Sequence, residues 1–417
     1  MYLSTIDRPA AASSGRRWTA IGANVVALGL VSLVTDVSAE MVTAVLPAYL
    51  VLGLGMTPLA YGAVDGIYTG ATAVLRLAGG WLADRTRRRK TVAGVGYGIS
   101  AIAKLGLLAV GTPVTAIGGV IAADRMGKGL RTAPRDALIT LSAPPALLGR
   151  AFGVHRTLDA AGAFLGPLVA LSILTATGSA ALTAASRDAF DAVFLFSFAV
   201  AAFGVLLLVL FVKEHRDPLA APRPRARDLA ALARDPRARR LTAAGCVLGL
   251  ATIGDGFVYL LLQRRSGLAV GWFPVLAVGT NLAYLLLAGL AGAVADRVGR
   301  ARVLLGGYLL LAAIYLALAT PWHGMPMIAL ILLLNGAFYA STDGVLMALA
   351  GPVLPATLRT TGLSMIQTGQ AVAYLGSSLL FGLVWQTWDT TAAVLVALAL
   401  TIAAGVTTGF LVRPRAH

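Results

Sequence analysis

Long apolar runs dominate this chain, and they limit its possible folds more than any other feature. A helix needs about 20 mostly apolar residues to cross the hydrocarbon core of a membrane. Runs of that kind occur at residues 22–51, 57–82, 91–110, 113–135, 149–176, 189–212, 241–263, 270–294, 301–319, 325–350, 360–385 and 390–412. They predict an all-α integral membrane protein with twelve transmembrane helices.

The composition favours lipid over water as the surroundings of this chain. Its 417 residues are 58% hydrophobic and 12% charged, whereas soluble domains carry about 25% charged residues. The net charge of +16 does not indicate a nucleic-acid partner, because the charges lie in short clusters between the apolar runs. The single cysteine, Cys246, excludes a disulfide within the monomer and argues against a cysteine-based metal site. We expect no metal and no cofactor.

The basic residues predict the orientation of the chain. The loops on one side of the membrane contain three of the 34 Lys and Arg residues, namely Arg187, Arg264 and Arg265. Others lie within or at the edges of the runs, and most fall at the termini and in the opposite set of loops. Loops rich in Lys and Arg stay in the cytoplasm. We therefore expect a multi-pass protein of the inner membrane with both termini in the cytoplasm.

A polar stretch at residues 213–240 divides the chain into two halves. It is rich in Arg, Pro and Ala, as expected for a cytoplasmic linker that lies on the membrane surface. We expect residues 1–212 to form an N-terminal bundle of six helices and residues 241–417 to form a C-terminal bundle of six.

A loop motif of the form Gly-x-x-x-Asp-Arg follows the second run and recurs after the eighth, about half a chain later. It resembles the signature loop of the major facilitator superfamily, and the resemblance implies two six-helix bundles related by an axis along the membrane normal. The first copy has Arg87 where the family usually has glycine. Glycine permits close helix approach, and the aspartate can cap a helix or pair with arginine, so this loop can hold one conformation closed. The expected gating residues are Gly80, Asp84, Arg85, Gly292, Asp296, Arg297 and Arg300.

Two further motifs resemble parts of the same superfamily. Arg125-x-x-Lys128 is similar to its fourth-helix motif, whose buried arginine is associated with proton transfer. Gly162-x-x-x-Gly166-Pro167 resembles part of the antiporter motif, which favours export. The motif Arg-x-Gly-Lys-Gly-x-Arg-Thr-x-Pro-Arg-Asp-Ala-Leu-Ile, which begins at Arg125, resembles a bacterial branch of the superfamily and implies no particular substrate.

Charged residues inside the runs are candidates for function, because ionised groups in a bilayer are costly unless they are paired or hydrated. Asp36 and Glu40 lie one helical turn apart near the middle of the first run, and Arg125 lies near mid-depth on the fourth. A carboxylate pair opposite a fixed cation can carry a proton, so we expect these three residues to couple transport to protons. The alternative is a structural network of ion pairs. Further charged candidates are Asp65, Arg76, Lys104, His155, Arg156 and Asp159.

The second half is polar rather than charged in its runs, which suggests hydrogen bonding and stacking with a substrate. Polar side chains also join helices to one another, so each position has this alternative role. The substrate-binding candidates are Lys128 and Arg156 in the first half, and Asp255, Tyr259, Gln263, Asn281, Tyr284, Asn335, Tyr339, Asp343, Gln367 and Gln370 in the second.

These features favour a proton-coupled secondary active transporter that works by alternating access and exports a small amphipathic or drug-like compound. An alternative is import of an organic anion or metal chelate, since cations are in excess in the first half. A membrane-embedded enzyme is a further alternative, which the internal repeat disfavours. The sequence contains no Gly-x-x-x-x-Gly-Lys-Ser/Thr motif, which argues against transport driven by the chain's own ATP hydrolysis. The expected partners are a small-molecule substrate, protons and lipid, with the chain acting as a monomer.

Overall fold

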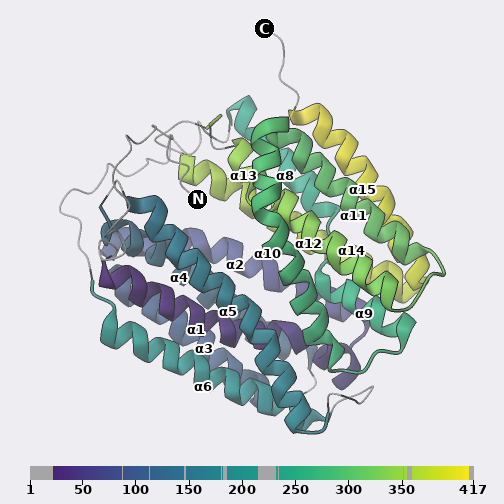
Figure 1. Ribbon diagram of the computed structural model, residues 1–417, viewed down its shortest axis with the longest axis horizontal. Coiled ribbons are helices and arrows are strands. Elements are labelled where there is room, and N and C mark those ends of the chain that lie inside the picture. The colour runs from purple at the N-terminus through teal and green to yellow at the C-terminus, as the bar shows by residue number, and fades with distance from the viewer. Residues whose placement is uncertain are drawn as a thin grey trace.

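Every long apolar run of the sequence lies in helical structure in the computed structural model of this protein (Figure 1). The structure describes residues 22–86, 88–111, 113–144, 147–179, 181, 186–214, 232, 234–350, 352–354 and 359–412. Within these ranges all regular secondary structure is helical, and the helices form twelve spans. The predicted all-α architecture with twelve spans is therefore confirmed.

Several spans consist of more than one helical segment. In chain order the spans are α1 (Ala23–Pro47) with the π-helix η1 (Ala48–Gly53), α2 (Pro58–Thr86), α3 (Arg89–Ala109), α4 (Val114–Leu141), α5 (Leu148–Ala176), α6 (Arg187–Phe211), α8 (Pro236–Leu250) with α9 (Asp255–Ser266), α10 (Trp272–Val298), α11 (Arg300–Ala319), α12 (Met325–Thr342) with α13 (Val345–Ala350), α14 (Arg359–Thr387) and α15 (Thr390–Val412).

The break between α8 and α9 interrupts a run that the sequence suggested was continuous. Backbone groups freed by a break inside a membrane need partners. Here the Tyr315 hydroxyl accepts a hydrogen bond from the Ile253 N–H at 3.1 Å and donates to the Ala251 carbonyl at 3.3 Å. The Thr401 hydroxyl also donates to the Ala251 carbonyl, at 3.1 Å. Side chains of α11 and α15 thus stabilise the break.

The surface of the bundle is apolar and its interior contains the charges. Leu309 is 73% exposed and Ile102 67% exposed, whereas Lys104, Arg125 and Arg131 are 2–3% exposed. This distribution is the reverse of that in a soluble protein, and lipid is the solvent that suits such a surface. Nine helical segments of the described chain are long and apolar enough to cross a membrane individually. The protein is therefore a multi-pass membrane protein.

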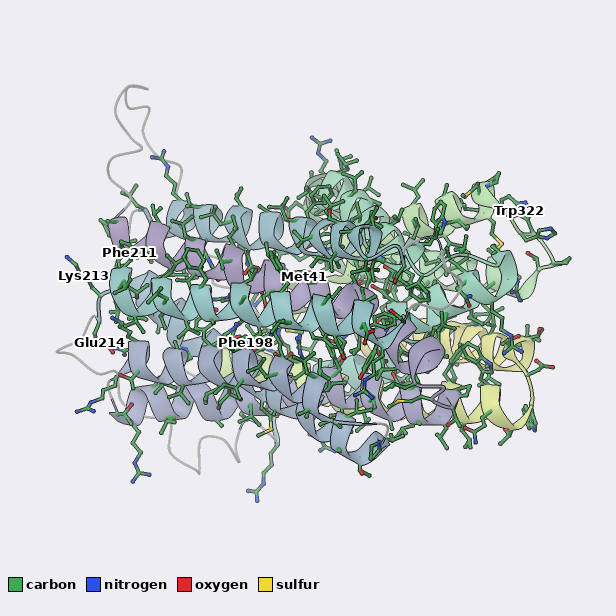
Figure 2. The ribbon with its side chains drawn as sticks, turned by 90° about the horizontal axis from the view of Figure 1, so that it is seen from below. Met41, Phe198, Phe211, Lys213, Glu214 and Trp322 are labelled. Atoms are coloured by element: carbon green, nitrogen blue, oxygen red, sulfur yellow. The ribbon has the colours of Figure 1, made fainter. Side chains whose placement is uncertain are left out.

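The two ends of the bundle are named here by their residues. Figure 2 shows Lys213, which follows α6, and Trp322, between α11 and α12, at opposite ends of the molecule. The end that contains Lys213 and the start of α8 is called the linker end, and the end that contains Trp322 is called the far end. The expected linker at 213–240 lies mostly outside the described residues, and α8 already begins at Pro236.

Glycines set how closely the helices approach. A Cβ added to Gly162 of α5 would overlap the Leu33 carbonyl oxygen of α1, and a Cβ added to Gly166 would lie 2.7 Å from the Val37 carbonyl oxygen. The Gly162–Gly166 spacing found in the sequence therefore serves direct contact between the α1 and α5 backbones.

This contact predicts opposite effects for two glycine substitutions in the same helix. Gly162→Ala should destabilise the protein by about 1–3 kcal/mol, because the new methyl group meets backbone that cannot move aside. Gly153→Ala should stabilise it by roughly 0.5–1 kcal/mol, because a Cβ at Gly153 meets nothing within 4 Å and alanine favours the helix. Thermal unfolding of both variants in the same detergent checks the difference. Equal shifts in the two variants would contradict the packing role of Gly162.

Candidate functional site

A cavity of about 380 Å³ lies between helices of the two halves, at the depth of the buried charges. Helices α1, α2 and α4 of the first half line it on one side, and α14 of the second half lines it on the other. Three of these four helices, α2, α4 and α14, are less apolar than the other spans. They are the spans that cannot be identified as membrane helices from their own length and composition. The lining residues are Glu40, Tyr68, Thr69, Thr72, Ala73, Arg76, Arg125, Lys128, Ser364, Gln367, Thr368 and Ala371.

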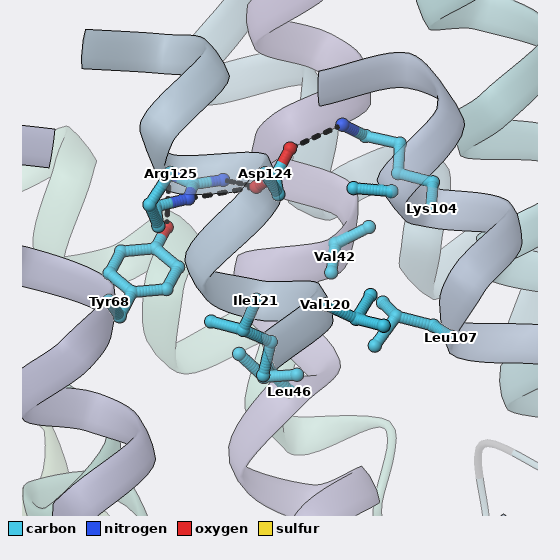
Figure 3. Close-up of a pocket in the computed structure, with 10 residues that line it drawn as sticks. Val42, Leu46, Tyr68, Lys104, Leu107, Val120, Ile121, Asp124 and Arg125 are labelled. Atoms are coloured by element: carbon cyan, nitrogen blue, oxygen red, sulfur yellow. Dashed lines mark hydrogen bonds and ion pairs between the residues drawn. The ribbon is translucent and has the colours of Figure 1, made fainter. Parts of the chain in front are cut away.

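A buried ion cluster around Asp124 joins α3 to α4 beside this cavity. Lys104 Nζ of α3 lies 3.1 Å from one oxygen of Asp124, and Arg125 Nε donates to the other at 2.8 Å (Figure 3). Ser100 donates a further hydrogen bond to Asp124. Arg125 Nη1 also donates to the Tyr68 hydroxyl at 2.8 Å, which extends the cluster to α2. One carboxylate thus neutralises part of the charge of two buried cations.

Asp36 and Glu40 of α1 share a different cation from the expected one. Lys128 Nζ lies 3.8 Å from an oxygen of each carboxylate, and Arg131 Nη2 lies 3.5 Å from Asp36. Arg125, one turn before Lys128, pairs with Asp124 instead. The structure therefore brings the two predicted carboxylates together, with Lys128 rather than Arg125 between them.

Asp159 of α5 completes the group around Asp36. Arg135 Nη1 lies 3.8 Å from the Asp159 carboxylate. The glycine contact between α1 and α5 brings these two acidic residues together, because Asp159 lies one helical turn before Gly162.

Arg76 of α2 links the two halves across the cavity. Its Nη1 donates to the Gln367 side-chain oxygen of α14 at 3.1 Å. Its buried Nε has no hydrogen-bond partner among the described residues.

At the far end the halves are in direct contact and seal the cavity on that side. A Cβ added to Gly62 of α2 would overlap the Ser378 carbonyl oxygen of α14, so the two backbones touch. Asp65 accepts hydrogen bonds from the Tyr374 hydroxyl at 2.9 Å and from the Ser378 hydroxyl at 2.7 Å. An aromatic cluster lies beside them, with Phe257 4.8 Å from the ring centres of both its neighbours Tyr61 and Phe381. Helices α5 and α10 also meet across the halves, where Asn281 donates to the Ala163 carbonyl at 3.5 Å.

Several other predicted substrate-binding residues make contacts within the second half. Asp255 accepts hydrogen bonds from Asn335 at 3.0 Å and from the Tyr339 hydroxyl at 2.8 Å. Tyr259 donates to Thr280. The remaining contacts are Tyr284 to Asp343 at 3.2 Å and Gln263 to the Leu268 carbonyl at 3.4 Å.

Lys128 and Gln367 are the two substrate-binding candidates that line the cavity. Arg156 is exposed and lies 3.9 Å from Asp159. The Gln370 carbonyl packs against Gly249 in α8.

The repeated loop is described fully in its second copy. Asp296 lies 3.7 Å from Arg300, and Arg300 Nη1 donates to the Ala348 carbonyl of α13 at 2.8 Å, which ties α10, α11 and α13 together. Arg297 is exposed, and a Cβ at Gly292 would meet nothing within 4 Å. In the first copy Arg85 is exposed, and the side chains at Gly80 and Asp84 lie outside the described part of the structure.

Sequence reasoning missed Asp124 and Tyr68 as parts of the site. The signal for Asp124 was its position next to Arg125 inside an apolar run, where a neighbouring opposite charge is the nearest partner. Tyr68 had no such signal, since one tyrosine in a membrane helix is unremarkable. Among the described residues no three His, Cys, Asp or Glu side chains come together as metal ligands would.

Comparisons with known proteins agree on one family. The family model described as Major Facilitator Superfamily matches residues 28–279 and 256–417. An uncharacterized MFS-type transporter of Methanocaldococcus jannaschii is 29% identical over 372 residues, which are 87% of this chain and 88% of that protein. An uncharacterized protein of Mycobacterium tuberculosis is 35% identical over 156 residues, 37% of this chain and 38% of that one.

Solved structures share the fold at low sequence identity. A mutant of the nucleoside transporter NupG superposes with a TM-score of 0.79 at 15% identity, covering 93% of this chain and 99% of that one. A bacterial homologue of the human lysosomal transporter Spinster, in an inward-facing and occupied conformation, gives a TM-score of 0.72 at 14% identity, with 93% and 96% covered. These likenesses concern the fold.

The ion cluster predicts a large loss of stability when its carboxylate is neutralised. Asp124→Asn leaves Lys104 and Arg125 without their shared anion in a site that excludes water, so we expect a loss of about 3–5 kcal/mol. Asp296→Asn is the control, because its side chain is 74% exposed and exposed ion pairs contribute about 1 kcal/mol or less. Thermal unfolding in detergent measures both. If the melting temperature falls no more in Asp124→Asn than in the control, the ion cluster does not stabilise the fold as proposed.

Proposed function

The chain belongs to the major facilitator superfamily, and we propose that it is a proton-coupled secondary active transporter that works by alternating access. Family and fold identify it as a transporter of small molecules rather than an enzyme. The observation that supports the mechanism best is the cavity lined from both halves, beside buried charges and sealed at the far end. A solute site that opens to one side at a time is what alternating access requires.

We propose that residues 1–212 and 241–417 are the two moving units, joined by the linker at 213–240. The excess of Lys and Arg at the linker end supports a cytoplasmic location for that end and for both termini. The described state is then the inward-facing one, in a bacterial inner membrane, with the protein acting as a monomer. The repeated loops, with Asp84 and Asp296, stabilise the opposite state at the linker end.

Asp36 and Glu40 are the proposed carriers of the coupling proton. Their shared contact with Lys128 supports a site where a proton can replace a cation as the partner of a carboxylate. Arg125 acts in this scheme through Tyr68, whose hydroxyl it holds at 2.8 Å and which also hydrogen-bonds Thr43 of α1 at 2.7 Å.

Export of a small amphipathic compound is the proposed direction. It rests on the Gly162-x-x-x-Gly166-Pro167 pattern and on the aromatic second half. An inward proton gradient can drive export or import, so the direction needs a transport measurement rather than an energetic argument.

Alternating access predicts complementary changes in exposure at the two ends. In a Cys246→Ser background, Ser364→Cys reports on the cavity and Leu375→Cys reports on the far-end seal, where Leu375 packs on Gly66. Adding Tyr374→Phe removes one hydrogen bond to Asp65. Such a bond contributes about 1 kcal/mol, so its loss should change the ratio of inward-facing to outward-facing protein by roughly fivefold. Labelling at Leu375→Cys from the far side should rise and labelling at Ser364→Cys from the linker side should fall.

The measurement uses a membrane-impermeant maleimide on right-side-out and everted vesicles. Tyr284→Phe is the matched control, because it also loses a hydrogen bond to an aspartate, but within the second half. A parallel rise at both reporters would indicate local loosening and contradict alternating access.

Proton coupling and direction are tested together by imposed proton gradients. Solutes that stabilise the purified protein in a thermal-shift screen are supplied to everted vesicles whose lumen is acidic. Wild-type protein should accumulate such a solute in these vesicles, and Asp36→Asn with Glu40→Gln should abolish the dependence on the gradient. Asp389→Asn, at an exposed position, should behave as wild type. Accumulation in right-side-out vesicles instead would establish import, and coupling retained in the double variant would exclude these carboxylates.

A further inference from the structure

Arg76, which is partly buried, differs from the other cations inside the first half in forming no ion pair with a carboxylate among the described residues. Lys104 and Arg125 pair with Asp124, and Lys128 and Arg131 lie near Asp36. Arg135 lies near Asp136 and Asp159. Around Arg76 the described residues place no carboxylate oxygen within 4 Å, and the hydrogen bond from Nη1 goes to the neutral amide of Gln367.

The surroundings of Arg76 leave part of the guanidinium unsatisfied. Its Nε is buried and has no partner among the described atoms. A buried cation without an anion is costly, because the low-dielectric interior replaces neither its hydration nor its counter-charge. The cost is removed when an anion from solution occupies the cavity beside it.

The cavity around Arg76 has the composition of an oxyanion site. Arg125 and Lys128 also line it, with Glu40 as the carboxylate among the lining residues. The hydroxyl-bearing residues Thr72, Ser364 and Thr368 line it as well. Ser364 and Thr368 come from α14, so an anion at Arg76 would be held by donors of both halves. Arginine suits this role because its planar donors match the geometry of carboxylates, phosphates and sulfonates.

We propose that the transported solute is an organic anion whose carboxylate, phosphate or sulfonate group binds at Arg76, opposite Gln367. This inference rests on the proposed transport function and specifies its substrate class. A cavity of about 380 Å³ admits a small organic molecule, with Tyr68, Ala73 and Ala371 available to its apolar part. The solute is thus an amphipathic anion, and its binding completes the charge balance of the cavity.

Charged thiol reagents test the inference without a transport assay. Thr72→Cys in a Cys246→Ser background places one thiol in the cavity. It is modified in neutral detergent by anionic sulfonatoethyl methanethiosulfonate or by cationic trimethylammonioethyl methanethiosulfonate. Relative to their rates with a small free thiol in the same detergent, the anionic reagent should be favoured over the cationic one. Arg76→Gln should lower the ratio of anionic to cationic rates by roughly tenfold. Any change in thiol ionisation affects both reagents equally and cancels in the ratio.

Two further variants separate charge from structure. Arg76→Lys keeps the positive charge, so it should retain most of the preference for the anionic reagent over the cationic one. Arg187→Gln removes a charge at the far end, where Arg187 is 45% exposed, and should leave the ratio unchanged. An unchanged ratio in Arg76→Gln overturns the proposal, and so does a ratio in the parent protein no higher than that for the small free thiol.

A competition experiment in the parent protein does not depend on folding of the Arg76 variants. Naphthoate should slow the reaction of the Thr72→Cys thiol with neutral methyl methanethiosulfonate, whereas the isosteric naphthamide should not. Protection by the amide equal to that by the carboxylate overturns the proposal. No gradient is present in these assays, so absence of transport with the anion preference intact would count against the proposed function and leave the anion site standing.

Discussion

The pairing of Asp124 with Lys104 and Arg125 is the interaction on which the first half of the bundle depends. Lipid offers these ions no hydration, so they are tolerated only where protein brings opposite charges together. That requires α3 and α4 to be close, and glycines make this possible, since a Cβ on Gly96 would lie 2.7 Å from the Gly127 carbonyl oxygen. Close packing and charge pairing therefore stabilise each other at this contact.

The need to keep polar groups away from lipid also explains which helices surround the cavity. Helices α2, α4 and α14 carry polar residues that line the cavity. The apolar helix α3, which packs against α4, has exposed apolar side chains such as Ile102 on the outside. A polar helix is stable in a membrane when apolar helices separate its polar face from lipid. The bundle as a whole therefore maintains a charged interior that no single one of these three helices could maintain.

The sequence was sufficient to predict the helices. It was not sufficient to predict most of the ion pairs and hydrogen bonds between them. Runs of apolar residues predicted all twelve spans, because hydropathy is a local property. The break before Asp255 escaped prediction, because Tyr315 and Thr401, which stabilise it, are distant in the chain. Lys128, rather than Arg125, faces the α1 carboxylates because of the rotation of α4 about its own axis. The contact of Arg76 with Gln367 depends on how the halves are placed, which periodicity does not contain.

The backbone contact between α2 and α14 acts as a mechanical stop. Gly62 meets the Ser378 carbonyl, and Gly382 meets the Pro58 carbonyl, so each helix rests on the other where no side chain intervenes. The backbone atoms in these two contacts have no titratable groups and no rotamers, unlike the neighbouring hydrogen bonds of Tyr374 and Ser378 to Asp65. In the proposed alternating access, this contact limits how closely α2 and α14 approach at the far end, whichever solute the cavity binds.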